Sequence, residues 1–533
     1  MKNIIKTMLL SVVILGMSSC TEEKILDLKP VNNILSPDAF TTPTLISTYM
    51  NGVYNAAAIG QYNAAPTSPN GGRGYVWGAA FVEQGETRGE DVVNMQTFYE
   101  LTYRGTYDPT TANNVYYWVD GYRLINRCNI MIEGTTDAVA KGIITQAVGN
   151  DYIGQAKFLR AITHLELLTY FAKPYFFTPG ATHPGIPYRE VGVNTSEEIK
   201  TESAKPRNTV AEVYAKVLTD LNDAETLITT GNSTSFSSRV VGRASKWAAI
   251  AFKTRLYLQK RDWANVIVEG NKLTSAFAIT ADPYAPFQNT TGSAPSNSES
   301  IFSIQHSAIS NPGSNAALAS ILKDRALVCI SPILWRDSKW LADDKRRENG
   351  KFIFTPASGI KYSNKYTDVT NRTDAAPVIR YAEVVLNMAE AQARLSNPTA
   401  ALTLLNSVRN RSLALPATQA YVAADFPTDA ALVAGILKER RIEFLQEGRR
   451  WTDIHRLQND PIPAIADANK GVPAKFANGA PAAAAYVLGN SFVVTTPVAA
   501  IPYENYKFLW PIPQIELNTN PGLGQNPDWN LKK

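Results

Sequence analysis

The chain has few of the residues that build redox and metal centres. Its 533 residues include three cysteines and four histidines. The histidines are far apart in the sequence: His164, His183, His306 and His455. Neither Cys128 nor Cys329 lies in a metal-binding motif. A disulfide between these two cysteines is possible in an oxidising compartment, but we expect two buried thiols. The sequence therefore predicts neither a metal site nor a cofactor.

Blocks of one charge are also absent. The chain has 52 Lys and Arg against 47 Asp and Glu, a formal charge of +5, and its arginines are scattered. This pattern lacks the clustered basic footprint of a nucleic-acid-binding protein. The chain also lacks a phosphate-cradling GxxxxGK[ST] loop, a complete dinucleotide loop and a G-x-S-x-G elbow. We therefore expect no nucleic-acid partner and none of these catalytic chemistries.

No hydrophobic run is long enough to cross a bilayer. Ten mostly apolar residues, Met8–Met17, follow Lys2 and Lys6, whereas a membrane span needs about 20. A basic start, a short apolar centre and small residues before a cleavage point are typical of a secretory signal. We predict that residues 1–19 are a signal peptide that is removed.

Cys20 follows the predicted cleavage point, and this arrangement resembles the lipobox of bacterial lipoproteins, although Met17 stands where Leu is commoner. In such proteins the new N-terminal cysteine is acylated, and several acyl chains together hold a protein stably on a bilayer. The next residues, Thr21, Glu22 and Glu23, resemble the acidic tag that directs such lipoproteins to the cell surface. Ordinary secretion is the alternative.

Helical periodicity recurs along residues 20–533, and no Gly/Ser-rich or Pro-rich linker divides them. We therefore predict a single, mainly α domain. Apolar residues at three- and four-residue steps predict helices at about 42–58, 112–133, 151–171, 210–228, 244–258, 262–273, 377–395, 398–411 and 428–447. These helices fall into neighbouring pairs with irregular spacing, which favours a stacked scaffold over about 112–273 and 377–450.

Three long stretches lack helical rhythm: 60–111, 274–376 and 451–533. Structureless loops of this length are uncommon unless they have a function. We expect a few short strands, irregular coil and the binding surface there.

Three glutamates lie four residues apart on one predicted helix face: Glu439, Glu443 and Glu447. A glycosidase needs two acids facing each other across a bond, one of them with a raised pKa. Here the neighbouring arginines favour the charged form of every carboxylate. We therefore predict structural ion pairing.

The same segment, "KERRIEFLQEGRRWTDIHR", resembles the helix and following turn typical of SusD/RagB-like nutrient-binding lipoproteins, with Arg449 where His is frequent. Other blocks match in the same order: "VYYWVDGYRLINRCNIMIE" (115–133), "GQAKFLRAITHLELLTYFAKPYFF" (154–177), "SKWAAIAFKTRLYLQKRDWANVI" (245–267), "VIRYAEVVLNMAEAQARL" with "ALTLLNSVRNRS" (378–412) and "FLWPIPQIELNTNPGLGQNPDW" (508–529). The ordered set covers nearly all of residues 20–533.

The resemblance implies a SusD-like, tetratricopeptide-like superhelical scaffold of helix pairs. It also implies a lipoprotein of the cell outer membrane, anchored through acylated Cys20 and facing the exterior. Its partner would be a TonB-dependent transporter of the SusC type. Its ligand would be an oligosaccharide or polysaccharide or, in some branches of the family, a peptide, and it would not be an enzyme. Helix residues such as Leu159, Ile162, Tyr170, Trp247, Leu258, Leu386 and Leu405 are then core, and Arg380, Glu383 and Glu390 pair internally.

Ligand contacts would belong to the long loops. Sugar recognition needs flat aromatic faces together with amides and charges. The N-terminal ligand-loop region, about 60–111, and the loop "LWRDSKW" supply candidates: Tyr62, Asn70, Arg73, Tyr75, Trp77, Phe81, Trp335, Arg336 and Trp340. The two loops could build one shallow aromatic platform. The alternative is that Trp77 and Trp335 pin their loops to the scaffold.

Two functions from other classes remain open. One is a secreted glycan-degrading enzyme that uses Glu83, Glu86 or Asp91, although the sequence places no acid pair together. The other is a pure assembly protein whose helix pairs only dock partners.

Overall fold

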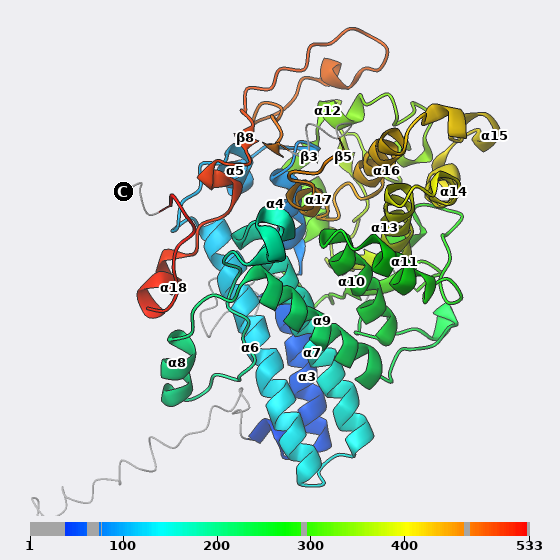
Figure 1. Ribbon diagram of the computed structural model, residues 1–533. Coiled ribbons are helices and arrows are strands. Elements are labelled where there is room, and N and C mark those ends of the chain that lie inside the picture. Colours follow the sequence, from blue (N-terminus) through cyan, green and yellow to red (C-terminus); the bar gives the residue numbers. More distant parts are fainter. Residues whose placement is uncertain (1–37, 61–73, 76, 289–295, 463–469, 530–533) are drawn as a thin grey trace, which may run out of the picture.

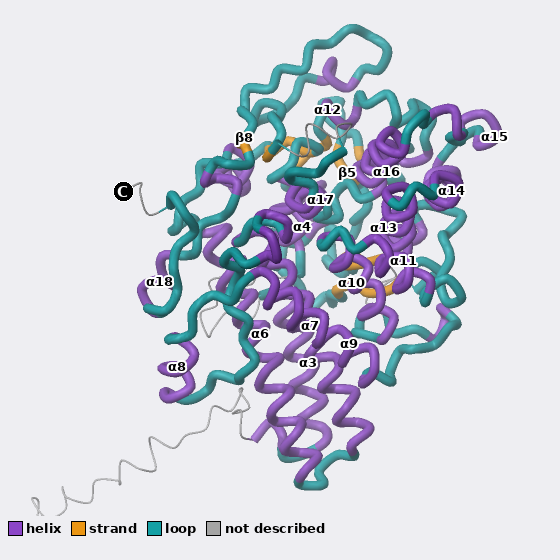
Figure 2. The backbone as a smooth tube through the Cα atoms, viewed as in Figure 1, coloured by secondary structure: helices purple, strands orange, loops and turns teal. Residues whose placement is uncertain are grey.

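Helices stacked in chain order form most of the protein (Figure 1), and Figure 2 shows loops wrapped around them. The computed structural model describes residues 38–60, 74–75, 77–288, 296–462 and 470–529. The predicted signal peptide and lipid-anchor residue Cys20 lie outside these ranges. The helices are α3 (Pro43–Ile59), α4 (Ala79–Thr87), α5 (Glu100–Arg104), α6 (Ala112–Ala140), α7 (Gln146–Phe171), α8 (Ser196–Ser203), α9 (Val210–Leu227), α10 (Lys246–Gln259), α11 (Trp263–Asn271), α12 (Pro332–Trp335), α13 (Tyr381–Arg394), α14 (Pro398–Arg409), α15 (Pro416–Gln419), α16 (Asp429–Glu443), α17 (Arg450–Arg456) and α18 (Gln514–Thr519).

Neighbouring helices pack against one another as a continuous series. Helix α6 packs on α7, α7 on α9, α9 on α10, α10 on α11, α11 on α13, and α13 on both α14 and α16. Helix α3 packs beside α6 at the N-terminal end of the series (Figure 1). The predicted mainly α scaffold of paired helices is confirmed.

Local sequence signals explain where several helices begin. Thr42 caps α3 by accepting a hydrogen bond from the Leu45 N–H, and Pro43 occupies the first helical position, where a missing N–H costs nothing. Thr209 and Glu212 form a reciprocal capping box at the start of α9. The polar side chains therefore satisfy N–H groups that the first turn leaves without partners.

Short strands connect the long loops to the scaffold. Among the described residues the strands form four two-stranded antiparallel sheets. The pairs are β1 (Val92–Asn94) with β3 (Val328–Ile330), β2 (Ser300–Ile304) with β6 (Ala376–Arg380), β4 (Ile353–Phe354) with β5 (Tyr362–Ser363), and β7 (Gly471–Val472) with β8 (Ile501–Pro502). Because Val93 pairs with Cys329, the first and second loop stretches meet at one sheet. The predicted few short strands are confirmed.

Some differences between the predicted and observed elements have a clear physical cause. Residues 79–87, expected in a loop, form α4; every residue of this helix is buried, so its sequence shows no amphipathic period. The helix predicted from 377 starts at Tyr381, because Ala376–Arg380 pairs with β2 instead. Helix α16 ends at Glu443 rather than at 447, and the carbonyl of Glu443 accepts hydrogen bonds from Lys365 and Arg380.

The apolar core joins the helices to the C-terminal segment. The predicted core residues are all buried: Leu159, Ile162, Tyr170, Trp247, Leu258, Leu386 and Leu405. Trp510 is also buried, and its backbone N–H donates to the Tyr170 carbonyl at 2.9 Å. Cys128 and Cys329 are free, buried thiols, as expected. No helix within the described ranges is long and apolar enough to cross a membrane.

Candidate functional site

The aromatic residues expected to form a ligand platform in the first loop are buried in the core. Tyr75, Trp77 and Phe81 expose only 1–2% of their surfaces. Trp77 donates its indole N–H to Thr163 Oγ1 at 3.1 Å, and its ring lies 4.7 Å from that of Phe81. The expectation that they are exposed is therefore wrong. Tyr62, Asn70 and Arg73 lie outside the described residues.

Two glycines next to these rings hold the chain close to the scaffold. A Cβ atom at Gly78 would lie 2.5 Å from the Ala58 carbonyl oxygen, and Gly74 has a φ of 66°. The chain at this point therefore folds tightly against the end of α3, which only glycine permits. Close backbone approach, rather than ligand access, explains the glycine-rich sequence here.

The second loop is pinned in the same way. Trp335 and Trp340 are 6% and 3% exposed, and the Trp335 indole N–H donates to the Tyr486 carbonyl at 2.9 Å. The Arg347 guanidinium lies 4.3 and 4.4 Å from the two ring centroids and donates to both of their backbone carbonyls. These tryptophans anchor the loop, which agrees with the alternative hypothesis that Trp335 pins its loop to the scaffold. They form no exposed platform with Trp77.

Arg336 is the remaining loop candidate with a described position, and it lines an open cavity of about 950 Å³. The walls come from α12, α16, α17, β7 and the segment that precedes β8. That segment projects from the body in Figure 1, and its residues Val494, Thr496 and Ala500 line the cavity. Arg336 holds it by donating to the backbone carbonyls of Val487 and Asn490 and to the Asn490 side chain. The guanidinium thus fixes one wall.

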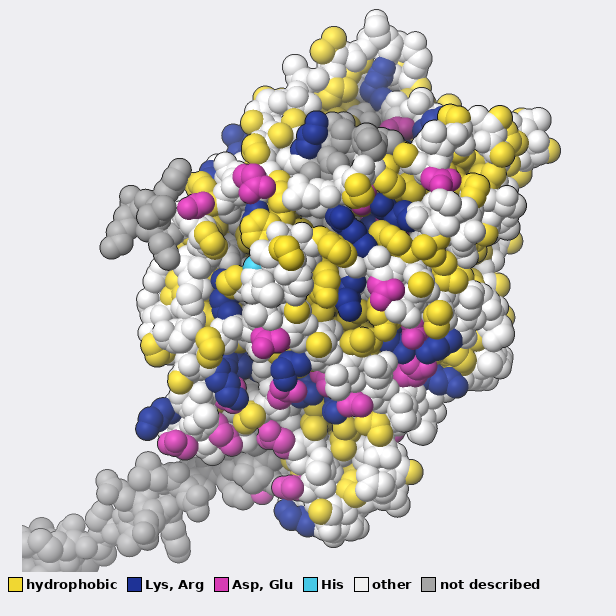
Figure 3. Space-filling view, in the orientation of Figure 1, with side chains coloured by type: hydrophobic (Ala, Val, Ile, Leu, Met, Phe, Trp, Pro, Cys, Tyr) yellow, Lys and Arg dark blue, Asp and Glu magenta, His cyan; other side chains and the backbone are white. Residues whose placement is uncertain are grey.

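The cavity carries an unequal number of positive and negative side chains. Figure 3 shows Lys and Arg side chains on the upper half of this face, over α12, α16 and α17. The lining includes five cations and three acids: Arg336, Lys438, Arg441, Arg450 and Lys470 against Glu90, Asp337 and Asp453. No aromatic ring is among the described residues that line it. The cavity is therefore polar and basic, with aliphatic patches.

Each acid of the cavity is held by cations. Glu90 receives hydrogen bonds from Arg450 at 2.6 and 3.0 Å and lies 2.8 Å from Arg441. Burial alone would raise the pKa of Glu90, but these two arginines hold it below its ordinary value. Asp337 pairs with Lys438 at 2.5 Å. Every carboxylate that faces the cavity is thus charged and neutralised by a neighbour.

Asp453 pairs with two arginines that are not part of the cavity lining. Arg440 and Arg456 approach its two carboxylate oxygens at 2.9 and 2.8 Å. Burial opposes ionisation, yet these arginines keep the pKa of Asp453 below its ordinary value. This acid is therefore a structural ion-pair partner and adds no unpaired negative charge to the described lining of the cavity.

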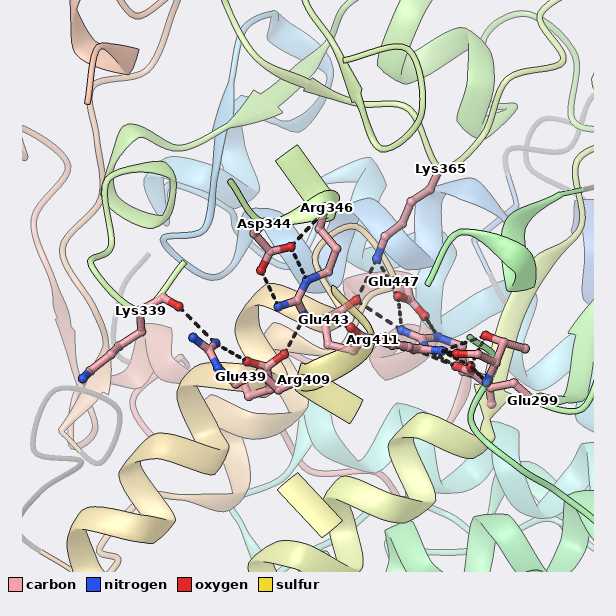
Figure 4. Close-up of polar contacts among 12 residues, drawn as sticks. Glu299, Lys339, Asp344, Arg346, Lys365, Arg409, Arg411, Glu439, Glu443 and Glu447 are labelled. Carbon is pink, nitrogen blue, oxygen red and sulfur yellow. Dashed lines mark hydrogen bonds and ion pairs between the residues drawn. The ribbon is translucent and has the colours of Figure 1, made fainter. Parts of the chain in front are cut away.

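Glu439, Glu443 and Glu447, the three glutamates spaced four residues apart, form a buried ion network at the C-terminal end of α16 (Figure 4). Glu443 is contacted by Arg346, Arg380 and Arg411 at 2.6–2.8 Å. These arginines outweigh burial and hold the pKa of Glu443 well below its usual range. Glu439 pairs with Arg346 and Arg409, and Glu447 with Lys365 and Arg380. The predicted structural ion pairing is confirmed.

The predicted internal pairing of the other scaffold charges is confirmed as well. Arg255 binds the Glu383 carboxylate through two 2.7 Å contacts. Glu390 pairs with Arg456 at 2.7 Å and with Arg394 at 2.9 Å. Each of these side chains exposes 5% or less of its surface and is engaged in an ion pair.

The acids that an enzyme was expected to use are inaccessible. Burial, reinforced by the neighbouring acid Asp91, raises the pKa of Glu86 to about 7, a shift that often marks a catalytic acid. However, Glu83 and Glu86 are 0% and 1% exposed. Glu86 borders a void of about 10 Å³, room for about one water molecule. Asp91 is bound by Arg441 at 3.0 and 3.1 Å.

The sequence did not indicate the cavity as a site. Lys438, Arg441 and Arg450 stand in a charged helical segment that predicts ion pairing, and part of their charge is used in that way. Lys470 is an isolated lysine with no motif around it. Only the folding of distant segments around α16 brings these cations together. Within the described residues, no cluster of three or more His, Cys, Asp or Glu could hold a metal ion.

Comparison with known proteins agrees with this architecture. A family model described as "Starch-binding associating with outer membrane" matches residues 24–258, and one described as "SusD family" matches residues 338–529. The two matches follow each other along the chain and together cover most of it. This chain belongs to the SusD family.

Individual SusD relatives agree in sequence and fold. SusD-like protein P38 of Formosa agariphila is 23% identical over 397 residues, 65% of this chain and 73% of that protein. A SusD superfamily protein from Bacteroides fragilis has a crystal structure that superposes with a TM-score of 0.71 at 25% identity, covering 91% of this chain and 100% of that one. A SusD-like carbohydrate binding protein from Bacteroides vulgatus superposes with a TM-score of 0.68 at 20% identity, covering 90% and 97%.

Proposed function

We propose that this SusD-family chain is a non-enzymatic carbohydrate-binding lipoprotein of the cell outer membrane. The open cavity of about 950 Å³ carries the proposal, because it is within the size range of small-ligand sites and gathers charged side chains from separate segments of the chain. The family description of starch binding at the outer membrane and the name of the B. vulgatus relative support a glycan as the ligand. A peptide is the alternative ligand class.

A binding role without catalysis fits the placement of the acids. The carboxylates of the cavity are held in ion pairs, so none is poised to donate a proton to a glycosidic oxygen. Glu83 and Glu86 lie under the surface, away from any bound glycan. A bound glycan would therefore be released from the cavity without having been cleaved.

Delivery to a transporter completes the proposed role. Cys20, acylated after removal of residues 1–19, would keep the mature chain, 20–533, on the outer face of the outer membrane. There it would capture a glycan and pass it to a partner TonB-dependent transporter of the SusC type. This part rests on the family resemblance and on the lipobox-like sequence at Cys20.

Calorimetric titration tests the binding role. The soluble mature protein, with Cys20 replaced by Ala, is titrated with plant, host and microbial glycans and with short peptides. Saturating heat at a fixed stoichiometry with a glycan supports the proposal, and the same result with peptides alone moves the chain to the peptide-binding branch. Heat that continues after each injection would mean turnover and would favour the glycan-degrading enzyme.

Two cellular experiments test the anchor and the partner. Cys20→Ala is expected to release the protein from outer membranes, and retention of this variant would contradict the lipid anchor. Affinity purification of the wild type from outer membranes is expected to recover a large barrel transporter. A pure assembly protein would bind the transporter but no glycan. Trp77→Ala is unsuitable for separating these roles, because the buried Trp77 supports the fold.

A further inference from the structure

The charge balance of the cavity points to the class of glycan that it accepts. Its acids are neutralised by neighbouring cations, whereas Arg336 and Lys470 form no ion pair with a described carboxylate. These two side chains account for the excess of two positive charges in the lining. We propose that the cavity binds an acidic oligosaccharide and that the carboxylate or sulfate groups of this ligand face Arg336 and Lys470. This inference rests on the proposed function.

The state of the two cations supports an anionic ligand. Lys470 is exposed, and its ammonium group forms no hydrogen bond or ion pair with another described side chain, so a ligand can reach it without breaking an existing pair. Arg336 is half-buried, and its guanidinium donates to neutral carbonyl and amide oxygens. Hydrogen bonds to neutral groups leave its positive charge uncompensated. An anionic oxygen would therefore gain charge-assisted hydrogen bonds here.

The remaining wall chemistry also disfavours a neutral ligand. Neutral sugars bind best on aromatic faces, and no described aromatic residue lines the cavity. The walls offer aliphatic side chains instead, among them Ile333, Leu437 and Val494. These can cover the C–H face of a sugar ring but supply little orientation. The cations would then provide most of the specificity, because charged partners at fixed positions select the register of a ligand.

The test uses glycans that differ only in charge. Oligogalacturonate is compared with its methyl ester, and a sulfated galactan oligosaccharide with its desulfated form, by calorimetric titration of the Cys20→Ala protein at low ionic strength. We expect at least one charged form to bind about tenfold or more tightly than its neutral counterpart. We also expect this difference to shrink as salt is added. The preferred pair tells whether carboxylate or sulfate is recognised.

Variants locate the effect. Lys470→Gln, at an exposed position, is expected to fold normally and to weaken binding of the charged glycan about tenfold while leaving its neutral counterpart unchanged. Arg336→Gln should also weaken binding of the charged glycan, but it removes the hydrogen bonds that hold the projecting segment and so is expected to weaken binding of the neutral counterpart as well. Lys351→Gln is the matched control, because Lys351 is exposed, pairs only with exposed Glu348 and lies outside the cavity lining.

The outcomes separate the two proposals. If neutral glycans bind and the charged forms bind no better, the acidic ligand class is wrong while the binding role stands. If the charged forms bind more tightly but neither Lys470→Gln nor Arg336→Gln reduces that preference, the placement of the anionic group at these two cations is wrong. If no glycan binds in either experiment, the proposed carbohydrate function itself is wrong.

Discussion

Removing Arg380 from the buried ion network should be the most damaging single charge substitution in the scaffold. Its guanidinium contacts the carboxylates of Glu299, Glu443 and Glu447, and it donates to the Glu443 carbonyl. Arg380→Met keeps an apolar stem of similar length but leaves three buried carboxylates with fewer counter-charges. Breaking a buried pair in this way costs about 3–5 kcal/mol of unfolding free energy. We expect the upper part of that range, because three acids are affected.

Urea unfolding followed by tryptophan fluorescence at pH 7 measures the loss. The control is Lys216→Met, which breaks the exposed pair with Glu190, whose side chains are 38% and 47% accessible. Such a surface pair contributes less than about 1 kcal/mol. Arg409→Met should fall between the two, because Arg409 pairs with one carboxylate, that of Glu439. An Arg380→Met loss no larger than that of Lys216→Met would refute the reasoning.

Four further expectations concern buried groups. Burial and Asp91 raise the pKa of Glu86 to about 7, so the folded state binds more protons than the unfolded state and stability falls as the pH rises from about 4.5 to 7. Glu86→Gln should abolish this loss in urea unfolding at pH 5 and 8, and an unchanged pH dependence would contradict it. Burial lowers the pKa of His455 to about 3, so stability should fall as the pH drops from 6.5 towards 3; His455→Gln should flatten this acid limb, whereas an equally steep limb would argue against a buried neutral ring. Burial raises the pKa of the Cys128 and Cys329 thiols to about 12, so neither should react with a thiol reagent in Cys20→Ala protein until denaturant is added, and rapid labelling of the native protein would show that they are accessible. Trp77→Ala should cost about 3–5 kcal/mol of unfolding free energy; loss of glycan binding at unchanged stability would restore its ligand role.

The helical scaffold could be predicted because amphipathic periodicity records which face of a helix is buried. Val210, Val213 and Val217 recur at helical spacing, and all three are buried in α9. The same reasoning fails for α4, where burial on every side removes the alternation. It also fails at residues 376–380, because pairing with β2 outweighs their continuity with α13. Tertiary contacts decided both cases.

The site was harder to predict, because the type of a residue does not determine whether its side chain is exposed to solvent. Trp77 and Trp335 have the flat rings that a sugar platform needs, yet both are anchors of their loops. Arg336 was predicted from the same loop and does reach the cavity. Lys470 arrives from a segment more than a hundred residues away in sequence, and no local pattern could connect the two. Charge pairing within one helix was predictable, whereas the convergence of separate segments was not.

A crystal structure of the soluble Cys20→Ala protein with a bound oligosaccharide tests the account most directly. The titrations described above supply the glycan. The account predicts an intact glycan in the cavity between α16, α17, β7 and the projecting segment, with an anionic group at Arg336 or Lys470. Electron density for a glycan at a different surface, or for a cleaved product, would contradict it.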